Sequence, residues 1–192
     1  MVHTQKDYST KYREANVYGN IDNAELAARI RPTSVLDRAG HVIWYDDFEA
    51  ANKKWYTDAQ GLAAECVISE HRSHFGDHSM KLVAGSNGLQ YGAMFKRLDW
   101  LPSGKIGMEY YFNIDADSDL MLFRLEIYNG TRHLRSNAVI DFDDDDISIT
   151  TEDVGAPNIA TGLDFFVGEQ RFHYIKIVVD PTTAMYDRLI FQ

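Results

Sequence analysis

The feature that most constrains this chain is the regular alternation of apolar and polar residues between Lys105 and Tyr128. Successive side chains of a β-strand point to opposite faces, so a period of two predicts half-buried antiparallel strands. Two such strands follow one another here, separated by a turn at 115–119. Their apolar positions are Met108, Tyr110, Phe112, Ile114, Met121, Phe123, Leu125 and Ile127. We expect both strands to lie in one sheet that buries these side chains.

The chain beyond residue 40 is also typical of short strands separated by turns. The expected strand ranges are 41–48, 62–70, 78–84, 89–98, 105–114, 120–128, 131–142, 146–151, 171–180 and 184–191. Asn87-Gly88 and Asn129-Gly130 indicate hairpins, because Asn-Gly tolerates the positive φ of a type I′ turn. The pattern predicts an all-β fold: an antiparallel β-sandwich, jelly-roll-like, that occupies residues 41–192.

Residues 1–40 differ from the rest, and we interpret them as an anchoring segment made of an extended arm and one short helix. Asp22 and Glu25 would form a capping box at the start of the helix, and Pro32 would end it. Tyrosines are more useful for contacting a partner than for remaining in solvent, although a flexible tail is the alternative. The residues expected to dock on a partner are Tyr8, Tyr12, Tyr18, Leu26 and Ile30.

Composition limits the classes of partner. A chain of 192 residues fits one domain with an appendage. Its net charge of −10 disfavours nucleic acid, since no basic patch offsets the repulsion of phosphates. The N-terminus lacks the apolar stretch of a signal peptide, and no run approaches the roughly 20 apolar residues of a membrane span. We therefore expect synthesis in the cytoplasm, no membrane partner and, because Cys66 is the single cysteine, no intrachain disulfide.

Two clusters could bind a metal, and each has a simpler explanation. The acidic run 141–146 offers oxygen ligands that suit Ca²⁺, but it lacks the glycine and the glutamate of an EF-hand. A solvated hairpin turn is the favoured interpretation. His71, His74 and His78 could hold Zn²⁺, yet Gly76-Asp77 places them around a turn, where nothing regular makes three imidazoles converge. Cys66, within an expected strand, is interpreted as a small buried hydrophobic residue.

The polar side of the 105–128 strands is the candidate binding surface. Sugar-binding sheets use aromatic and charged side chains in this way, and a glycosidase could draw two carboxylates from such a face. An ordinary solvent face or a subunit interface is the alternative. No acid–base pair is distinguished by its local context, so we select no catalytic residue and expect no enzyme. The candidate sugar-binding residues are Glu109, Tyr111, Arg124, Glu126 and Tyr128, with Asn113 on the same face.

The opening of the expected sandwich has a recognisable layout. Residues 45–49, Tyr-Asp-Asp-Phe-Glu, are followed by Trp55 and by 76–82, Gly-Asp-His-Ser-Met-Lys-Leu. In this the chain resembles galactose-binding-like and concanavalin-like jelly rolls, including many carbohydrate-binding modules. In several of those families a structural Ca²⁺ bridges the first strand and an Asp of the last strand. The resemblance therefore implies a structural Ca²⁺ at Asp47 or Glu49, together with Asp187.

A second resemblance rests on residues 25–29, on the linker 37–44 and on the strand pair 172–180 and 186–191. In these parts the chain resembles uncharacterised β-sandwich proteins encoded among the structural genes of tailed phages. This implies a non-catalytic virion structural protein, a capsid decoration or tail-associated subunit that docks through its N-terminal arm. Its partners would be other virion proteins and further copies of itself in a homo-oligomer. The alternative is a carbohydrate-binding β-sandwich module with a glycan as its partner.

Overall fold

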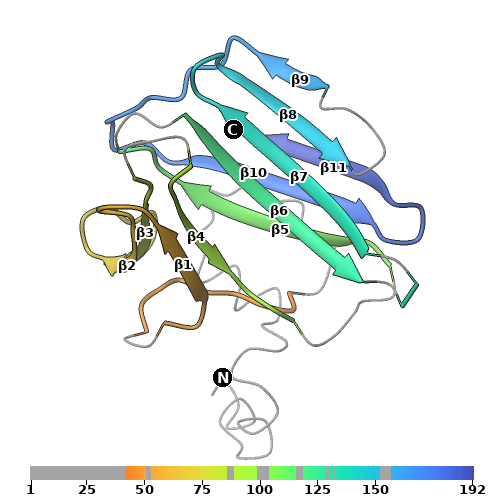
Figure 1. The fold of residues 1–192 in the computed structure, drawn as a ribbon, viewed down its shortest axis with the longest axis horizontal. Helices are drawn as coiled ribbons and strands as arrows, with labels where there is room; N and C mark the ends of the chain where they lie inside the picture. Colours follow the sequence, from red (N-terminus) through yellow and green to blue (C-terminus); the bar gives the residue numbers. More distant parts are fainter. Residues whose placement is uncertain are drawn as a thin grey trace, which may run out of the picture.

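The computed structural model describes residues 42–50, 53–85, 89–98, 104–115, 119–128, 130–131, 133–151 and 157–192. All regular elements in these ranges are strands, which confirms the predicted all-β fold (Figure 1). They are β1 (Tyr56–Gln60), β2 (Glu65–Ser69), β3 (Ser79–Val83), β4 (Tyr91–Phe95), β5 (Ile106–Phe112), β6 (Leu120–Tyr128), β7 (His133–Asp141), β8 (Asp146–Thr151), β9 (Asn158–Thr161), β10 (His173–Asp180) and β11 (Met185–Phe191). The predicted helix and arm lie outside the described residues. Within the described residues there is no helix of a length and hydropathy that would cross a bilayer.

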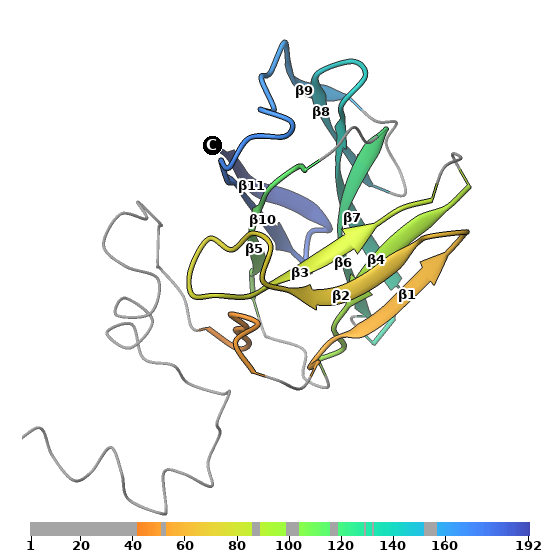
Figure 2. The ribbon, with the colours of Figure 1, turned by 90° about the vertical axis from the view of Figure 1, so that its left-hand side faces the viewer.

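Two antiparallel sheets form the sandwich. One has the strand order β11-β10-β5, and the other is the meander β6-β7-β8-β9. Figure 2 shows them as separate layers, with β1–β4 beside them. The apolar sides of the two sheets meet in one core that contains Ile114, Phe123, Ile127, Ala138, Ile140, Ile147, Phe165, Ile175, Ile177 and Val179. The sequence alternation therefore predicts correctly which side of β5 and of β6 faces inward.

The expectation that the strands at 105–128 share one sheet is wrong. β5 pairs with β10, whereas β6 pairs with β7. The two strands face each other across the core: the ring of Phe123 lies 5.5 Å from that of Tyr110 and 5.2 Å from that of Phe112. Alternation determines which side of a strand is apolar, but it carries no information on which neighbour the backbone pairs with. Both strands bury the same kind of side, so facing one another satisfies the pattern as well as pairing does.

The strands β1–β4 form two short ribbons, β1 with β4 and β2 with β3, that pack closely against each other. A Cβ at Gly92 would lie 2.6 Å from the carbonyl oxygen of Val83, so only glycine fits there. Cys66 lies at the same contact, with Sγ 3.3 Å from the carbonyl oxygen of Ala93. Its side chain is buried, as predicted, and burial raises the pKa of the thiol. We call this pair of ribbons the β1–β4 module.

The predicted strand at 41–48 is not formed over its described residues, and hydrogen bonds of Asp46 and Asp47 turn the chain at its end. The Asp46 carboxylate accepts bonds from the backbone N–H of Phe48 at 3.2 Å and from Trp55 Nε1 at 2.9 Å. Phe48 has a φ of 62°, which is incompatible with an extended strand. Asx turns of this kind compete with sheet ladders. The strands β1 and β9 were not predicted, since both are short and largely exposed.

The acidic run forms the turn between β7 and β8, which confirms the hairpin interpretation. The carboxylate of Asp141 accepts hydrogen bonds from the backbone N–H groups of Asp143 and Asp144 at 3.1 and 3.3 Å. Asp145 adopts a φ of 53°, a conformation that Asp tolerates better than most residues. The first carboxylate of the run therefore organises the turn.

Candidate binding face

The outer side of the four-stranded sheet carries a compact group of polar and aromatic side chains. The antiparallel register places Arg124 opposite Asn137, Glu126 opposite Arg135, and Tyr128 opposite His133. Directly opposed side chains of antiparallel strands lie close enough to interact. We define the β6–β7 face as Arg124, Glu126, Tyr128, His133, Arg135 and Asn137.

Glu126 is the centre of the charged contacts on this face. Its Oε1 accepts from Arg135 Nε at 3.0 Å and lies 3.6 Å from Arg124 Nη1. Its Oε2 lies 3.5 Å from His133 Nε2. The side chains of all four residues are about two-fifths exposed, so solvent screens these pairs and their contribution to stability is small. The arrangement therefore orients the guanidinium groups more than it stabilises the fold.

Two further contacts hold the rest of the face in place. Asn137 accepts from Arg124 Nε at 2.9 Å through Oδ1 and donates to Thr150 Oγ1 at 2.6 Å through Nδ2, which links β6, β7 and β8. The Tyr128 hydroxyl donates to the carbonyl oxygen of Gly130 at 3.1 Å. The Tyr128 residue is nevertheless 63% exposed. Its ring is thus a fixed aromatic surface that a ligand can reach.

The structure divides the five predicted sugar-binding residues between two faces. Arg124, Glu126 and Tyr128 are together on the β6–β7 face. Glu109 and Tyr111 lie on β5, on the outer side of the other sheet, where Glu109 pairs with Lys176 at 2.6 Å. The expectation of a single polar face is therefore wrong, because β5 and β6 belong to different sheets.

Sequence reasoning missed three members of the β6–β7 face: His133, Arg135 and Asn137. The predicted strand 131–142 contains all three, but the strand range alone does not say which residues oppose β6. Had the loop length between Tyr128 and His133 been known, the register would have followed by counting outward from it. The two-residue turn expected at Asn129-Gly130 would instead pair Tyr128 with Thr131, whereas Tyr128 pairs with His133.

The outer side of β5 is covered by the connection between β2 and β3. The ring of His74 stacks on that of Tyr111 at 4.1 Å, and the Phe75 ring meets Tyr111 edge-on at 5.7 Å. Burial lowers the pKa of His74. Asn113, the third polar residue predicted on this strand, accepts from Arg72 at 2.8 Å. This face is accordingly occupied by the chain itself.

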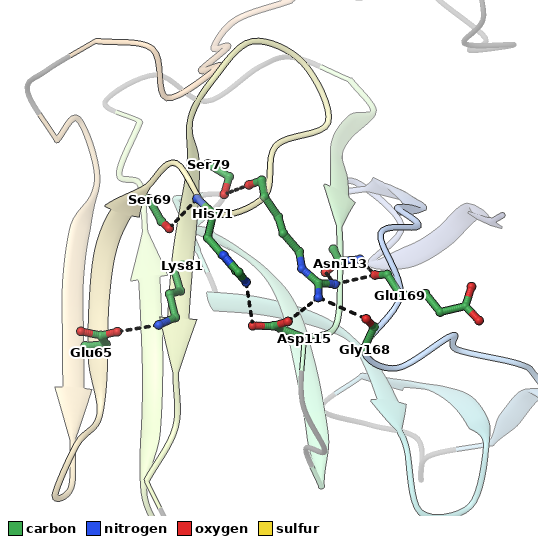
Figure 3. A network of polar contacts seen from close by, with 10 residues as sticks. Glu65, Ser69, His71, Ser79, Lys81, Asn113, Asp115, Gly168 and Glu169 are labelled. Atoms are coloured by element: carbon green, nitrogen blue, oxygen red, sulfur yellow. Dashed lines mark hydrogen bonds and ion pairs between the residues drawn. The ribbon is translucent and has the colours of Figure 1, made fainter.

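Arg72 holds this connection against the sandwich, and Figure 3 shows its partners Asn113, Asp115, Gly168 and Glu169 close together. Besides Asn113 it contacts the Asp115 carboxylate at 2.6 Å and donates to the carbonyl oxygens of Gly168 and Glu169. Its side chain is only 17% exposed. One guanidinium thus joins the β2–β3 connection, the end of β5 and the loop before β10. This is a structural use of the fixed donor geometry of arginine.

The residues considered for metal binding lie apart. His78 contacts Glu49 at 3.0 Å and Glu70 at 3.4 Å, whereas His71 lies 3.5 Å from Asp115 and His74 stacks on Tyr111. Across the described residues, no three His, Cys, Asp or Glu side chains are grouped so that they could hold a metal ion.

The three residues named for Ca²⁺ have other partners. Asp47 accepts from the backbone N–H of Glu49 at 3.3 Å. Glu49 Oε1 accepts from the N–H groups of Asp77 and His78, both at 2.8 Å. Asp187 pairs with Lys105. Each carboxylate therefore serves a local contact in the fold.

The Glu49–His78 pair is expected to stabilise the fold most between roughly pH 4.5 and 6.5. The hydrogen bond to Glu49 raises the pKa of His78 above 6.5, and the same bond lowers the pKa of Glu49 below 4.5. A raised His pKa contributes stability below its unfolded value, and this is lost as pH rises through the folded value. A lowered Glu pKa contributes above its unfolded value and is lost as pH falls.

Chemical denaturation of the wild type and of His78→Gln at a series of pH values checks this expectation. The difference in unfolding free energy should shrink on both sides of the window. His71→Gln, at an exposed histidine near Asp115, is the matched control. A His78→Gln effect that is constant with pH would contradict the linkage.

Comparisons with family models, with curated proteins and with solved structures give no significant match for this chain.

Proposed function

We propose that this chain is a non-catalytic structural subunit of a viral particle, a capsid decoration or tail-associated protein that docks through its N-terminal arm. The resemblance to phage β-sandwich proteins suggests the class. The observation that carries the proposal is the set of large apolar side chains that are exposed on the β1–β4 module. Exposed apolar patches on a folded domain mark surfaces that bind other proteins. A subunit that assembles with other virion proteins, and with copies of itself, requires such a surface.

Most of the large apolar side chains that are exposed among the described residues lie between Tyr56 and Leu98. They are Tyr56, Leu62, Val67, Leu82, Leu89, Tyr91, Phe95 and Leu98, against Leu120, Leu122, Tyr128, Ile159, Val167 and Met185 elsewhere.

Leu62 and Leu89 are the most exposed of these residues, at 86% and 85%. Their loops are adjacent, since a Cβ at Gly61 would meet the side chain of Gln90. Two neighbouring leucines therefore lie exposed to solvent in adjacent loops of the module. Burying each of them in an interface would be worth about 1.5–3 kcal/mol.

The double variant Leu62→Ser/Leu89→Ser tests the proposal. We expect the variant to fold normally. When it is added to particles assembled without the native chain, the amount that binds should be more than tenfold lower than for the wild type, because the apolar contacts that both leucines would make in the interface are lost. Particle-bound protein is measured by quantitative mass spectrometry. Leu120→Ser/Met185→Ser, at exposed apolar positions outside the module, is the control. Equal incorporation of both variants, or purified particles that never contain the chain, would contradict the proposal.

A carbohydrate-binding module is a second candidate function, and one specific observation favours it. The β6–β7 face combines an exposed aromatic ring with oriented carboxylate, guanidinium and amide groups. Faces that bind sugars need both an apolar platform and a few placed polar groups. The two functions are compatible, because the β6–β7 face and the β1–β4 module are separate surfaces.

A further inference from the structure

We propose that the β6–β7 face binds an acidic oligosaccharide, with a sugar carboxylate held by Arg124 and Arg135 and a sugar ring placed against Tyr128. The inference deepens the carbohydrate-binding candidate by naming its ligand class. It does not depend on the viral assignment.

The balance of charge on the face selects an anionic ligand. Two guanidinium groups share one carboxylate, that of Glu126, so the face carries one excess positive charge. This excess stands out on a chain whose net charge is −10. A local patch of the opposite sign on an acidic protein attracts anions to that patch specifically.

The contacts made within the chain leave guanidinium donors for a ligand. Among the described contacts, Arg135 uses Nε for Glu126, and Arg124 uses Nε for Asn137 and Nη1 for Glu126. Each guanidinium has five N–H donors in a planar fork that matches a carboxylate. The existing bonds fix the planes of both groups before a ligand arrives, which lowers the entropy cost of binding.

Because of Tyr128, an anionic saccharide matches this face better than anions without a sugar ring do. Its hydroxyl is held by the carbonyl oxygen of Gly130, while the residue remains 63% exposed. An aromatic ring fixed in this way offers a flat apolar surface at the edge of the charged group. A polyphosphate such as nucleic acid would meet the repulsion of the whole acidic chain, whereas a short uronic-acid oligosaccharide carries few charges.

Isothermal titration of the full-length protein with oligogalacturonate tests the proposal. The matched ligand control is the methyl-esterified oligomer, which keeps the sugar rings and loses the charge. Poly-glutamate controls for anions that are not sugars. We expect binding of oligogalacturonate alone, weakening as salt is raised because exposed charges are screened.

Three variants should change the affinity for oligogalacturonate in opposite directions, which would not occur if these residues only stabilised the fold. Arg135→Gln and Tyr128→Ala should each weaken binding about tenfold, whereas Glu126→Gln should strengthen it by removing the competing carboxylate. Arg171→Gln, at an exposed arginine paired with Glu169, should change nothing. The proposal is overturned by preference for the methyl ester, by equal binding of poly-glutamate, by an unchanged Arg135→Gln, or by no binding. None of these results bears on particle incorporation, which tests the viral assignment separately.

Discussion

The Phe123→Ala variant is expected to lose about 3–5 kcal/mol of unfolding free energy, enough to leave a marginal domain partly unfolded. Phe123 is buried on β6 and contacts the rings of Tyr110 and Phe112 on β5, which belongs to the opposite sheet. Truncation therefore removes a contact between the two layers and leaves a cavity that the strands cannot close, because each is fixed in its own hydrogen-bonded ladder.

Leu122→Ala is the control for this change, since Leu122 is the preceding residue of the same strand and points to the opposite side. It is 41% exposed, so its truncation should cost less than about 1 kcal/mol. Urea denaturation followed by tryptophan fluorescence measures both values. If the two variants were equally stable, β6 would not face β5 across a core.

Hydrophobic periodicity predicts most strands of this chain because burial acts on each strand locally. The expected ranges 120–128 and 146–151 coincide with β6 and β8. Apart from 41–48, which is not formed over its described residues, the other expected strands differ from the observed ones only at their ends. The inward residues of β5 and β6 could likewise be assigned without coordinates. The predicted all-β sandwich follows from these local patterns together with the turn residues between them.

Hydrophobic periodicity does not predict which strands pair with each other. β5 pairs with β10, whose residues lie between 61 (Phe112 to His173) and 73 (Ile106 to Val179) positions further along the chain, and no local pattern encodes that choice. The candidate sugar-binding set was consequently split, with Glu109 and Tyr111 on one face and Glu126 on the other. The expected strand at 41–48 was misassigned for another reason: the carboxylates of Asp46 and Asp47 form Asx turns, which outcompete strand formation over a short apolar run.

The Arg72→Met variant should have the second-largest effect, a loss of about 2–3 kcal/mol of unfolding free energy, because hydrogen bonds to charged groups are strong and the Arg72 side chain is only 17% exposed. Methionine keeps much of the side-chain volume and removes the charge. Four acceptors lose the Arg72 guanidinium: Asn113, Asp115 and the carbonyl oxygens of Gly168 and Glu169. The carbonyl oxygen of Glu169 keeps its hydrogen bond from Asn113 Nδ2, and Asp115 keeps its contact with His71. Since these lie in separate segments, the β2–β3 connection should detach from the outer side of β5 before the sandwich itself unfolds.

Arg171→Met is the matched control, because Arg171 belongs to the same loop as Glu169 but its side chain is 62% exposed and its ion pair is screened by solvent. Hydrogen exchange should then show faster exchange at 70–78 in Arg72→Met only, with the amides of β6–β8 unchanged. Equal protection of 70–78 in both variants would mean that aromatic stacking of His74 on Tyr111 suffices to hold the connection. In that case the contacts of Arg72 would result from the packing of the connection and would not cause it.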